Sequence, residues 1–187
     1  MEQRSTEKDL IQRLRAGDQE ACVKLVREYH APIYRLLFHL CGDRHRAEDL
    51  VQETFASAWA GLGSFGGAST LATWLYRIAY RKFLDARRKS PSMRIAHDAA
   101  DNRADDGTMD PVMRVVADED TSRLYEAIAQ LPDDERAVIV LHHLQGMRYE
   151  QIAEMTGVPD GTLRWRKSQA LERLRRLLQE KLEYEID

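Results

Sequence analysis

The densest group of polar residues with recognisable chemistry lies near the C-terminus, between residues 161 and 181. Basic residues outnumber acids there, since Glu172 and Glu180 stand against Arg164, Arg166, Lys167, Arg173, Arg175, Arg176 and Lys181. Such a local excess is typical of a surface that neutralises nucleic-acid phosphates. Arginine and lysine also suit the acceptor edge of guanine, and Gln169 suits adenine. The segment therefore predicts a nucleic-acid interface.

The residues around this segment predict the secondary structure that carries the basic residues. Ile152 lies on the apolar face of a short helix, and Gly157 permits the positive φ of a tight turn. The next helix is expected to turn Leu163, Leu171 and Leu174 inward. This pattern indicates a helix-turn-helix, whose second helix enters the major groove with its early turns. The alternative is an ordinary helical hairpin with a solvated basic face.

A second basic group falls on one predicted helix in the first half of the chain. Between residues 74 and 89 a single acid, Asp85, accompanies Arg77, Arg81, Lys82, Arg87, Arg88 and Lys89. Tyr76, Tyr80 and Phe83 are interleaved with these charges. Aromatic rings can stack on unpaired bases while cations hold the phosphates, so the helix predicts a surface for single-stranded nucleic acid. The alternative is that Trp74 and most of the aromatic residues belong to the core.

Other site chemistry is not supported by the sequence. A zinc site could be imagined from Cys22, His30, Cys41 and His45, but their spacing matches no zinc-finger pattern and the cysteines lie in apolar stretches. The adjacent histidines 142 and 143 point to different helix faces. The chain has no phosphate-binding glycine loop and no nucleophile elbow. We therefore expect no metal, no cofactor, no small-molecule substrate and no catalytic activity.

The elements that position these residues are predicted to be helices throughout. Of the 187 residues 43% are apolar, and they recur at helical spacing. Gly-Asp pairs at positions 17–18 and 42–43 each end one helix and start the next, and Pro32 marks a further helix start. Glycines make 61–67 a loop, and a long helix then runs to about residue 89. The predicted fold class is all-α.

Two helical domains are expected, spanning residues 1–92 and 120–187. Between them, residues 93–119 are rich in aspartate and lose the apolar periodicity, which predicts a flexible acidic linker. The alternative is an acidic tether that screens a basic face. In the second domain Asp133 and Asp134 are expected in the first turn of a helix, where acids suit the macrodipole.

Composition narrows the setting in which the protein works. The net charge is −3, which excludes a uniformly basic nucleic-acid coat but not separate basic patches. No run of about 18 apolar residues is present, and the N-terminus lacks the apolar stretch of a signal peptide. Two cysteines are too few for a disulfide scaffold. A cytoplasmic protein without membrane insertion is expected.

Taken together, the motifs resemble the sigma-70 family of bacterial RNA polymerase sigma factors. The segments 47–55, 58–59, 65–69 and 73–79 resemble sigma region 2, and 131–136 with 149–178 resembles region 4. The length and the missing regions 1 and 3 look like the extracytoplasmic-function subgroup. The resemblance covers nearly all of residues 6–180 except the linker.

The resemblance implies a role for particular residues. In the family, the helix matching Asp49, Gln52, Glu53 and Phe55 docks on the clamp helices of the polymerase. The first three lie at i, i+3 and i+4 and so share one polar face. A loop and helix of the family capture and melt the minus-ten element, and they match Phe65, Ala68, Ser69, Trp74, Arg77, Tyr80, Arg81, Lys82 and Arg88. The helix that reads the minus-thirty-five element matches Thr162, Arg164, Trp165, Arg166, Lys167, Gln169 and Arg173.

Some positions depart from the family pattern. Asp160 stands where a small or apolar residue is common, Trp165 replaces a small residue, and Lys167 replaces leucine. Residues 80–82 replace a stretch that often contains asparagine. These departures affect which promoter bases are recognised and which residues contact them.

The sequence therefore predicts a sigma factor that binds core RNA polymerase and directs promoter-specific transcription initiation at minus-ten and minus-thirty-five elements. The resemblance to the family also implies a cognate anti-sigma factor that holds the protein inactive. The alternatives are a stand-alone helix-turn-helix regulator that never contacts polymerase, and a sigma-like interaction protein that titrates a partner.

Overall fold

The structure is a computed structural model that describes residues 2–89 and 119–184, with side chains described for 7–89 and 121–179. The chain divides into two compact units, Met1–Pro91 and Ser92–Asp187. The described residues form helices and turns and contain no strand, which confirms the all-α prediction. The predicted linker, 93–119, lies outside the described residues except at its last position.

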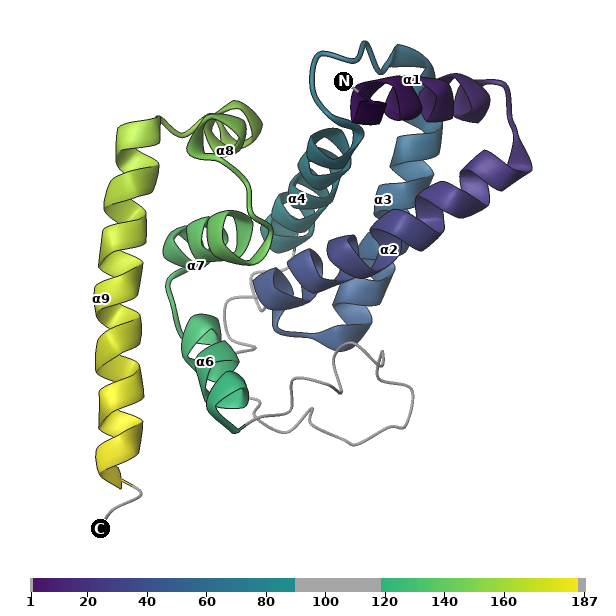
Figure 1. Ribbon diagram of the computed structural model, residues 1–187. Coiled ribbons are helices and arrows are strands. Elements are labelled where there is room, and N and C mark those ends of the chain that lie inside the picture. The colour runs from purple at the N-terminus through teal and green to yellow at the C-terminus, as the bar shows by residue number, and fades with distance from the viewer. Residues whose placement is uncertain (1, 90–118, 185–187) are drawn as a thin grey trace. The chain divides into compact units, whose positions relative to one another are not determined.

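The first unit is a bundle built around its longest helix (Figure 1). Its elements are α1 (Glu2–Arg15), α2 (Gln19–Cys41), α3 (Arg44–Gly61), a 3₁₀ turn (Leu62–Ser64) and α4 (Leu71–Lys89). Helix α2 packs on both α3 and α4, α3 packs on α4, and α1 packs on α2. The core is rich in leucine, with full burial of Leu25, Ile33, Leu36, Leu37, Leu71 and Leu75.

Helix boundaries in this unit follow from Gly-Asp pairs, as predicted. Before α2, the Asp18 carboxylate accepts hydrogen bonds from the backbone N–H groups of Glu20 (2.9 Å) and Ala21 (3.2 Å). At the other end, Gly42 adopts a φ of 68° and its N–H donates to the carbonyl of Phe38. Asp43 then accepts from the N–H of Arg46 at 2.9 Å and caps α3.

The predicted helix start at Pro32 is wrong, because α2 runs through this residue without a break. Proline removes one backbone hydrogen bond inside a helix, at a cost of about 3 kcal/mol. The same buried face continues on both sides of the proline, with Ala21 and Leu25 before it and Ile33 and Leu36 after it. Packing of this stripe offsets the lost bond.

The second unit contains α6 (Glu119–Ala129), α7 (Asp133–Ile139), α8 (Tyr149–Thr156) and α9 (Asp160–Tyr184) (Figure 1). Helix α9 packs on α6, α7 and α8. Helix α7 continues as a π-helical turn over Val140–Leu144, where the N–H of Gln145 donates to the carbonyl of Val140 at 3.0 Å. Gly146, at a φ of 66°, lies just after this turn, where the end of the helix was predicted.

One buried position of α9 differs from the prediction. Leu163 and Leu174 are buried as expected, but Leu171 is 39% exposed and Ala170 is fully buried in its place. A straight helix that buries Leu163 turns position 170 back to the same face after seven residues and position 171 away from it. The small side chain of Ala170 lets the neighbouring helices lie close to α9 there.

A search of the described residues finds no helix with the length and hydropathy needed to cross a membrane.

His39 lies within the core of the first unit and makes its stability depend on pH. Burial, assisted by the charge of Arg35, lowers the pKa of His39 from 6.5 to about 4. The unfolded chain binds a proton near pH 6.5 and the folded chain only near pH 4. The contribution of His39 to the free energy of unfolding is therefore fully present above pH 6.5 and is lost as the pH falls towards 4.

We expect urea unfolding, followed by helical circular dichroism, to show a loss of roughly 2 kcal/mol at pH 5 relative to pH 7.5 from this residue. His39→Gln removes the titrating group and should flatten this dependence, whereas His45→Gln, at an exposed histidine, should not. An equal pH dependence in wild type and His39→Gln would contradict the assignment.

Candidate nucleic-acid interface

The polar face of α3 is presented as the sequence predicts. Asp49, Gln52 and Glu53 are exposed, because Leu50, Val51, Thr54 and Ala58 turn the opposite face of α3 into the core. Thr54 is buried at no cost in hydrogen bonding, since its hydroxyl donates to the carbonyl of Leu50 at 2.6 Å. The face carries a negative charge that a basic partner can meet.

Phe55 does not share this face. Its side chain is 7% exposed and its ring stacks on His30, with centroids 6.3 Å apart. An aromatic side chain beneath a helix fixes the position of that helix but offers little surface to a partner. The motif brings Phe55 close to these polar residues in sequence, but the helical period places it on another face of α3.

The glycine-rich loop before α4 has an aromatic floor and a small, exposed rim. Phe65 is buried and its ring packs on Trp74 with centroids 4.9 Å apart. Trp74 is half-buried, so it belongs partly to the core, as the alternative interpretation held. Above this floor Ala68 is exposed and Ser69 is half-buried, and Gly67 adopts a φ of 72°. The loop thus rests on the packed rings of Phe65 and Trp74, and its exposed residues have small side chains.

Helix α4 begins at this loop and carries the basic residues at different depths. The hydroxyl of Thr70 accepts from the N–H of Thr73 at 3.2 Å and caps the helix. Arg81 and Arg88 are exposed, and Arg77 is half-buried. Arg88 forms an ion pair with Asp85. The exposed arginines are available to phosphates.

Two aromatic residues of α4 face inward instead. Tyr80 is 9% exposed and its ring lies 6.1 Å from that of Phe83, which is also buried. The alternative interpretation is therefore correct for this pair, and stacking of Tyr80 on an unpaired base is not favoured. Alternation of aromatic and basic residues along the sequence could not reveal this, because helical residues one apart lie on different faces.

An ion pair joins the acidic face of α3 to the basic face of α4. The ammonium group of Lys82 lies 3.5 Å from the Glu53 carboxylate, which joins α4 to α3. Lys82 is half-buried and Glu53 is exposed. A residue expected at DNA and a residue expected at a protein partner are therefore coupled, which their separation in sequence did not reveal.

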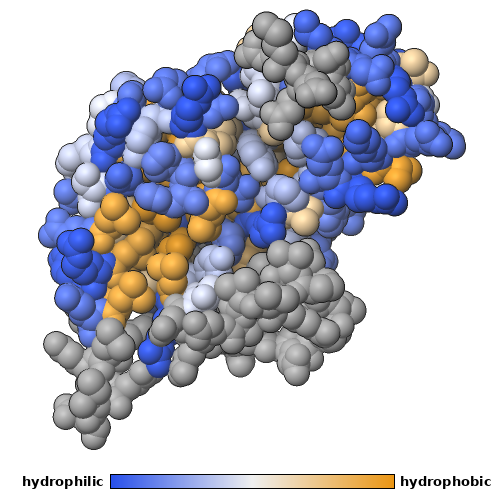
Figure 2. Space-filling view, in the orientation of Figure 1, coloured by the Kyte–Doolittle hydropathy of each residue, from blue (hydrophilic) through white to orange (hydrophobic). Residues whose placement is uncertain are grey.

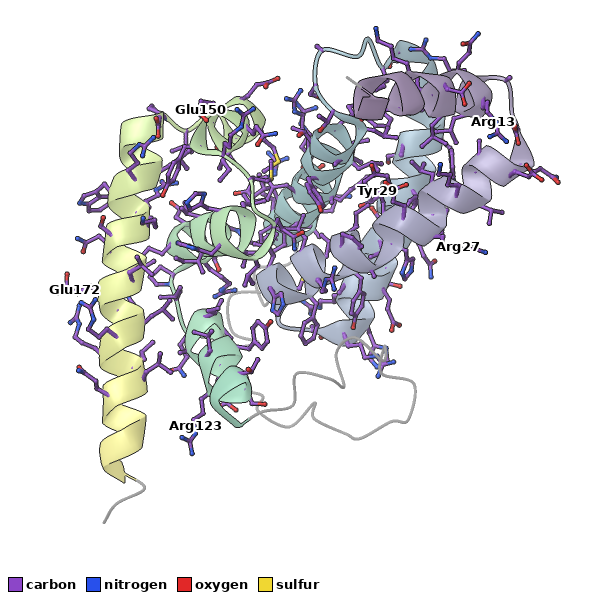
Figure 3. The ribbon with its side chains drawn as sticks, in the orientation of Figure 1. Arg13, Arg27, Tyr29, Arg123, Glu150 and Glu172 are labelled. Carbon is purple, nitrogen blue, oxygen red and sulfur yellow. The ribbon has the colours of Figure 1, made fainter. Side chains whose placement is uncertain are left out.

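In the second unit, α8 and α9 form the predicted helix-turn-helix. Gly157 ends α8 at a φ of 74°, and its N–H donates to the carbonyl of Ala153 at 2.8 Å. Helix α9 then begins at Asp160. Acidic side chains such as Glu150 of α8 and Glu172 of α9 project outwards (Figure 3).

The first turn of α9 holds one arginine by two contacts. The Arg164 guanidinium donates to both carboxylate oxygens of Asp160, at 2.8 and 3.2 Å. The same group lies over the ring of Tyr149, 4.4 Å from its centroid. Asp160 departs from the family pattern, and the structure shows that it orients Arg164. Tyr149 was not singled out in the sequence, since only its contact in space connects it to α9.

Two further arginines of α9 are paired with acids from α7. Arg166 lies 2.7 Å from Asp134, and Arg173 donates to both oxygens of Glu135 at 3.2 and 3.4 Å. The sequence placed such acids in the first turn of α7 for the sake of the helix dipole. The structure adds that they neutralise part of the basic helix.

The other predicted residues of α9 lie along its early turns. Trp165 is 61% exposed, the most exposed of the large apolar side chains described. Thr162, Lys167 and Gln169 are half-buried. Partial desolvation, together with the nearby His142 and Lys167 side chains, lowers the pKa of His143.

The imagined zinc ligands are spread over the first unit. Cys41 is buried, Cys22 is half-buried and His30 stacks on Phe55. Within residues 7–89 and 121–179, no group of three or more histidine, cysteine or acidic side chains is arranged to hold a metal ion.

The comparisons with known proteins match both units. The profile of Sigma-70 region 2 matches residues 25–91, and that of Sigma-70, region 4 matches residues 121–174. The RNA polymerase sigma-H factor of Pseudomonas aeruginosa is 35% identical over 181 residues, covering 92% of this chain and 94% of that protein. The ECF RNA polymerase sigma factor SigW of Bacillus subtilis is 32% identical, covering 92% and 97%.

Solved structures of other proteins are similar to this chain. The sigma factor RpoE of Bartonella quintana, crystallised with the anti-sigma factor NepR, has a TM-score of 0.67 and 28% identity, covering 83% of this chain and 95% of that chain. CnrH in complex with the cytosolic domain of CnrY has a TM-score of 0.68 at 22% identity, covering 93% and 97%, and supports the fold.

The ion pair between α7 and α9 predicts an effect on duplex binding. Arg166 must leave Asp134 before it can hold a phosphate, so Asp134→Asn should remove a competitor. A partly exposed pair contributes about 0.2–1 kcal/mol, which corresponds to roughly 1.5- to 5-fold tighter binding of duplex DNA at low salt.

Titration of a fluorescent duplex at several salt concentrations measures this effect. Glu126→Gln, which removes an equal charge from α6, controls for net charge. If both variants bind DNA with the same affinity, Asp134 does not restrain Arg166.

Proposed function

Because the chain belongs to the extracytoplasmic-function subgroup of the sigma-70 family of RNA polymerase sigma factors, we propose a division of labour between its two units. The first unit binds core RNA polymerase and captures melted minus-ten DNA. The second unit reads the minus-thirty-five element as a duplex. The observation that carries this proposal is the presence of one acidic and two basic surfaces on a chain whose net charge is only −3.

The polymerase-binding surface in this proposal is the exposed face of α3. Gln52 and Glu53 lie about one helical turn after Asp49, and the three side chains together offer carboxylate and amide acceptors. Basic residues of a polymerase helix are the expected partners. Phe55 contributes from the core, by holding α3 in position.

The minus-ten surface is proposed at the glycine-rich loop and the exposed face of α4. The packing of Phe65 on Trp74 and the small side chains of Ala68 and Ser69 support a site that receives an unpaired base. Arg77, Arg81, Lys82 and Arg88 are assigned to the phosphates of the non-template strand. Tyr80 has a packing role beneath them.

The minus-thirty-five surface is proposed on the early turns of α9. Arg164 is assigned to a base edge, because its guanidinium is held in one orientation by Asp160 and Tyr149. Exposed Trp165 suits contact with a thymine methyl group, and Thr162, Lys167 and Gln169 lie close by in sequence. Arg166 and Arg173 are assigned to phosphates.

Regulation by a cognate anti-sigma factor is part of the proposal. It is supported by the complex of RpoE with NepR from Bartonella quintana. It is also supported by the apolar surface of the second unit near α6 and α9 (Figure 2), two helices that expose Leu124 and Leu171. We place this activity in the cytoplasm, where the polymerase performs the chemistry and this chain performs none.

Run-off transcription tests the proposed function. Core polymerase and the full chain are incubated with a pool of genomic fragments, and transcript starts are sequenced. The proposal predicts a shared pair of elements upstream of the starts. Binding of duplex DNA without any promoter-specific transcript would identify a stand-alone regulator, and binding of polymerase without transcription would identify an interaction protein.

Asp49→Ala and Gln52→Ala should each weaken binding to core polymerase by about tenfold, because each removes a group from the centre of the docking face. Fluorescence titration of labelled variants with core polymerase measures the loss. Glu48→Gln is the matched control, since Glu48 is exposed on the same helix but pairs with Arg44 at 3.2 Å. Equal affinities for all three variants and wild type would place the polymerase contact elsewhere.

Arg164→Lys should relax the base preference at one position of the minus-thirty-five element. It keeps the charge and removes the planar fork, and a bidentate contact to a base discriminates by about 1–3 kcal/mol. Run-off transcription from promoters randomised in this element gives the preference directly. Arg175→Lys, exposed further along α9, should leave it unchanged. An unaltered preference in Arg164→Lys would assign Arg164 to a phosphate.

A further inference from the structure

Helix α1 contacts the glycine-rich loop with two of its side chains. This helix ends at Arg15, ahead of the residues that match Sigma-70 region 2, which begin at residue 25. Glu7 and Arg15 lie about two helical turns apart and so share one face of α1. That face reaches the loop at both of its ends.

Arg15 holds the end of the loop that is nearest to α3. Its guanidinium donates to the backbone carbonyl of Leu62 at 3.4 Å and to the carbonyl of Phe65. These two carbonyls mark the start and the exit of the 3₁₀ turn, and an arginine fork can engage both at once. Phe65 is therefore fixed twice, by its side chain on Trp74 and by its carbonyl on Arg15.

Glu7 holds the other end of the loop, where α4 begins. Its carboxylate accepts a hydrogen bond from the N–H of Leu71, the first residue of α4. The first N–H groups of a helix have no partner within that helix, and a negative charge there also suits the helix dipole. Leu71 is fully buried, so its position in the core is fixed along with its N–H.

Between these two points the loop consists of small or polar residues. Gly66 and Gly67 have open space where a side chain would stand, and Ala68 is exposed. A segment fixed at both ends loses less conformational entropy when it receives a ligand than a free one does. The anchors therefore determine the shape of the rim without occupying it.

We infer that Glu7 and Arg15 are positioning residues that hold the loop 61–70 in the shape that receives an unpaired minus-ten base. The inference rests on the proposed function for the role of the loop. The loop contacts themselves are independent of that function, and this allows the two to be tested separately.

The first measurement uses the free full-length chain. Hydrogen exchange of the amides of residues 62–71 is compared in wild type, Arg15→Ala, Glu7→Ala and Glu7→Gln. We expect exchange to be at least tenfold faster in both alanine variants and close to wild type in Glu7→Gln, which keeps an acceptor oxygen. Gln12→Ala, exposed on the same helix, is the control. Unchanged exchange in both alanine variants overturns the inference.

The second measurement uses the same variants in holoenzyme on a promoter found by run-off transcription. Permanganate reactivity of unpaired thymines and the response to single minus-ten substitutions are recorded. Arg15→Ala and Glu7→Ala should lower promoter melting about tenfold and reduce discrimination at the captured base about fivefold. Affinity for core polymerase should stay within twofold of wild type. Simple unfolding of the variants would instead lower polymerase affinity and promoter melting together. The molecules that remained folded would then show an unchanged base preference.

The outcomes separate the inference from the function on which it rests. Faster exchange with wild-type melting and base preference overturns the positioning role. A wild-type holoenzyme that yields no promoter-specific transcript overturns the proposed function and the base-receiving role, while hydrogen exchange still decides whether α1 anchors the loop.

Discussion

The continuous buried face of α2 is the constraint on which the first unit depends. Its leucines and Ile33 pack against both α3 and α4, and the stripe is strong enough to carry the helix through Pro32. Because two helices rest on one, each can bury only its inner face. Their polar residues therefore face outward, and the exposed face described on α3 is acidic whereas that on α4 is basic. The Lys82–Glu53 pair marks the line along which these two surfaces meet.

Pairing of basic residues with acids of the same unit recurs in both units. Arg166, Arg173 and Arg164 each face a carboxylate of the same unit, and Lys82 does likewise. Exposed ion pairs of this kind are weak, so a polyanion can displace them at small cost. The pairs keep side chains extended in defined directions before any partner arrives. They also make every productive contact sensitive to ionic strength.

The sequence was a good guide wherever a single residue type fixes local backbone geometry. Gly42 and Gly157 end helices because they adopt positive φ, and Asp18 and Asp43 start them because their carboxylates accept backbone N–H groups. It was a poor guide where packing overrides local preference, as at Pro32, or where one step of helical rotation decides burial, as at Leu171 and Phe55. The contacts of Tyr149, Glu135 and Arg15 could not be predicted, since each joins residues far apart in the chain whose proximity only tertiary folding creates.

The π-helical turn at Val140–Leu144 has a consequence for how Arg164 of α9 is supported. A π turn takes up one residue more than an α-helical turn, and here it ends the helix, so it sets where the chain leaves α7 before Gly146 turns it towards α8. Within this turn the His142 ring forms a hydrogen bond with the carbonyl of Met147 at 2.8 Å and stacks on Tyr149 with ring centroids 4.2 Å apart. Tyr149 in turn lies beneath Arg164. Deletion of His143 would keep the buried Val140 and Leu141 of this turn, yet shorten the path by which the chain reaches Tyr149. A chain that lacks one residue here would therefore support Arg164 differently even if its α9 were identical in sequence.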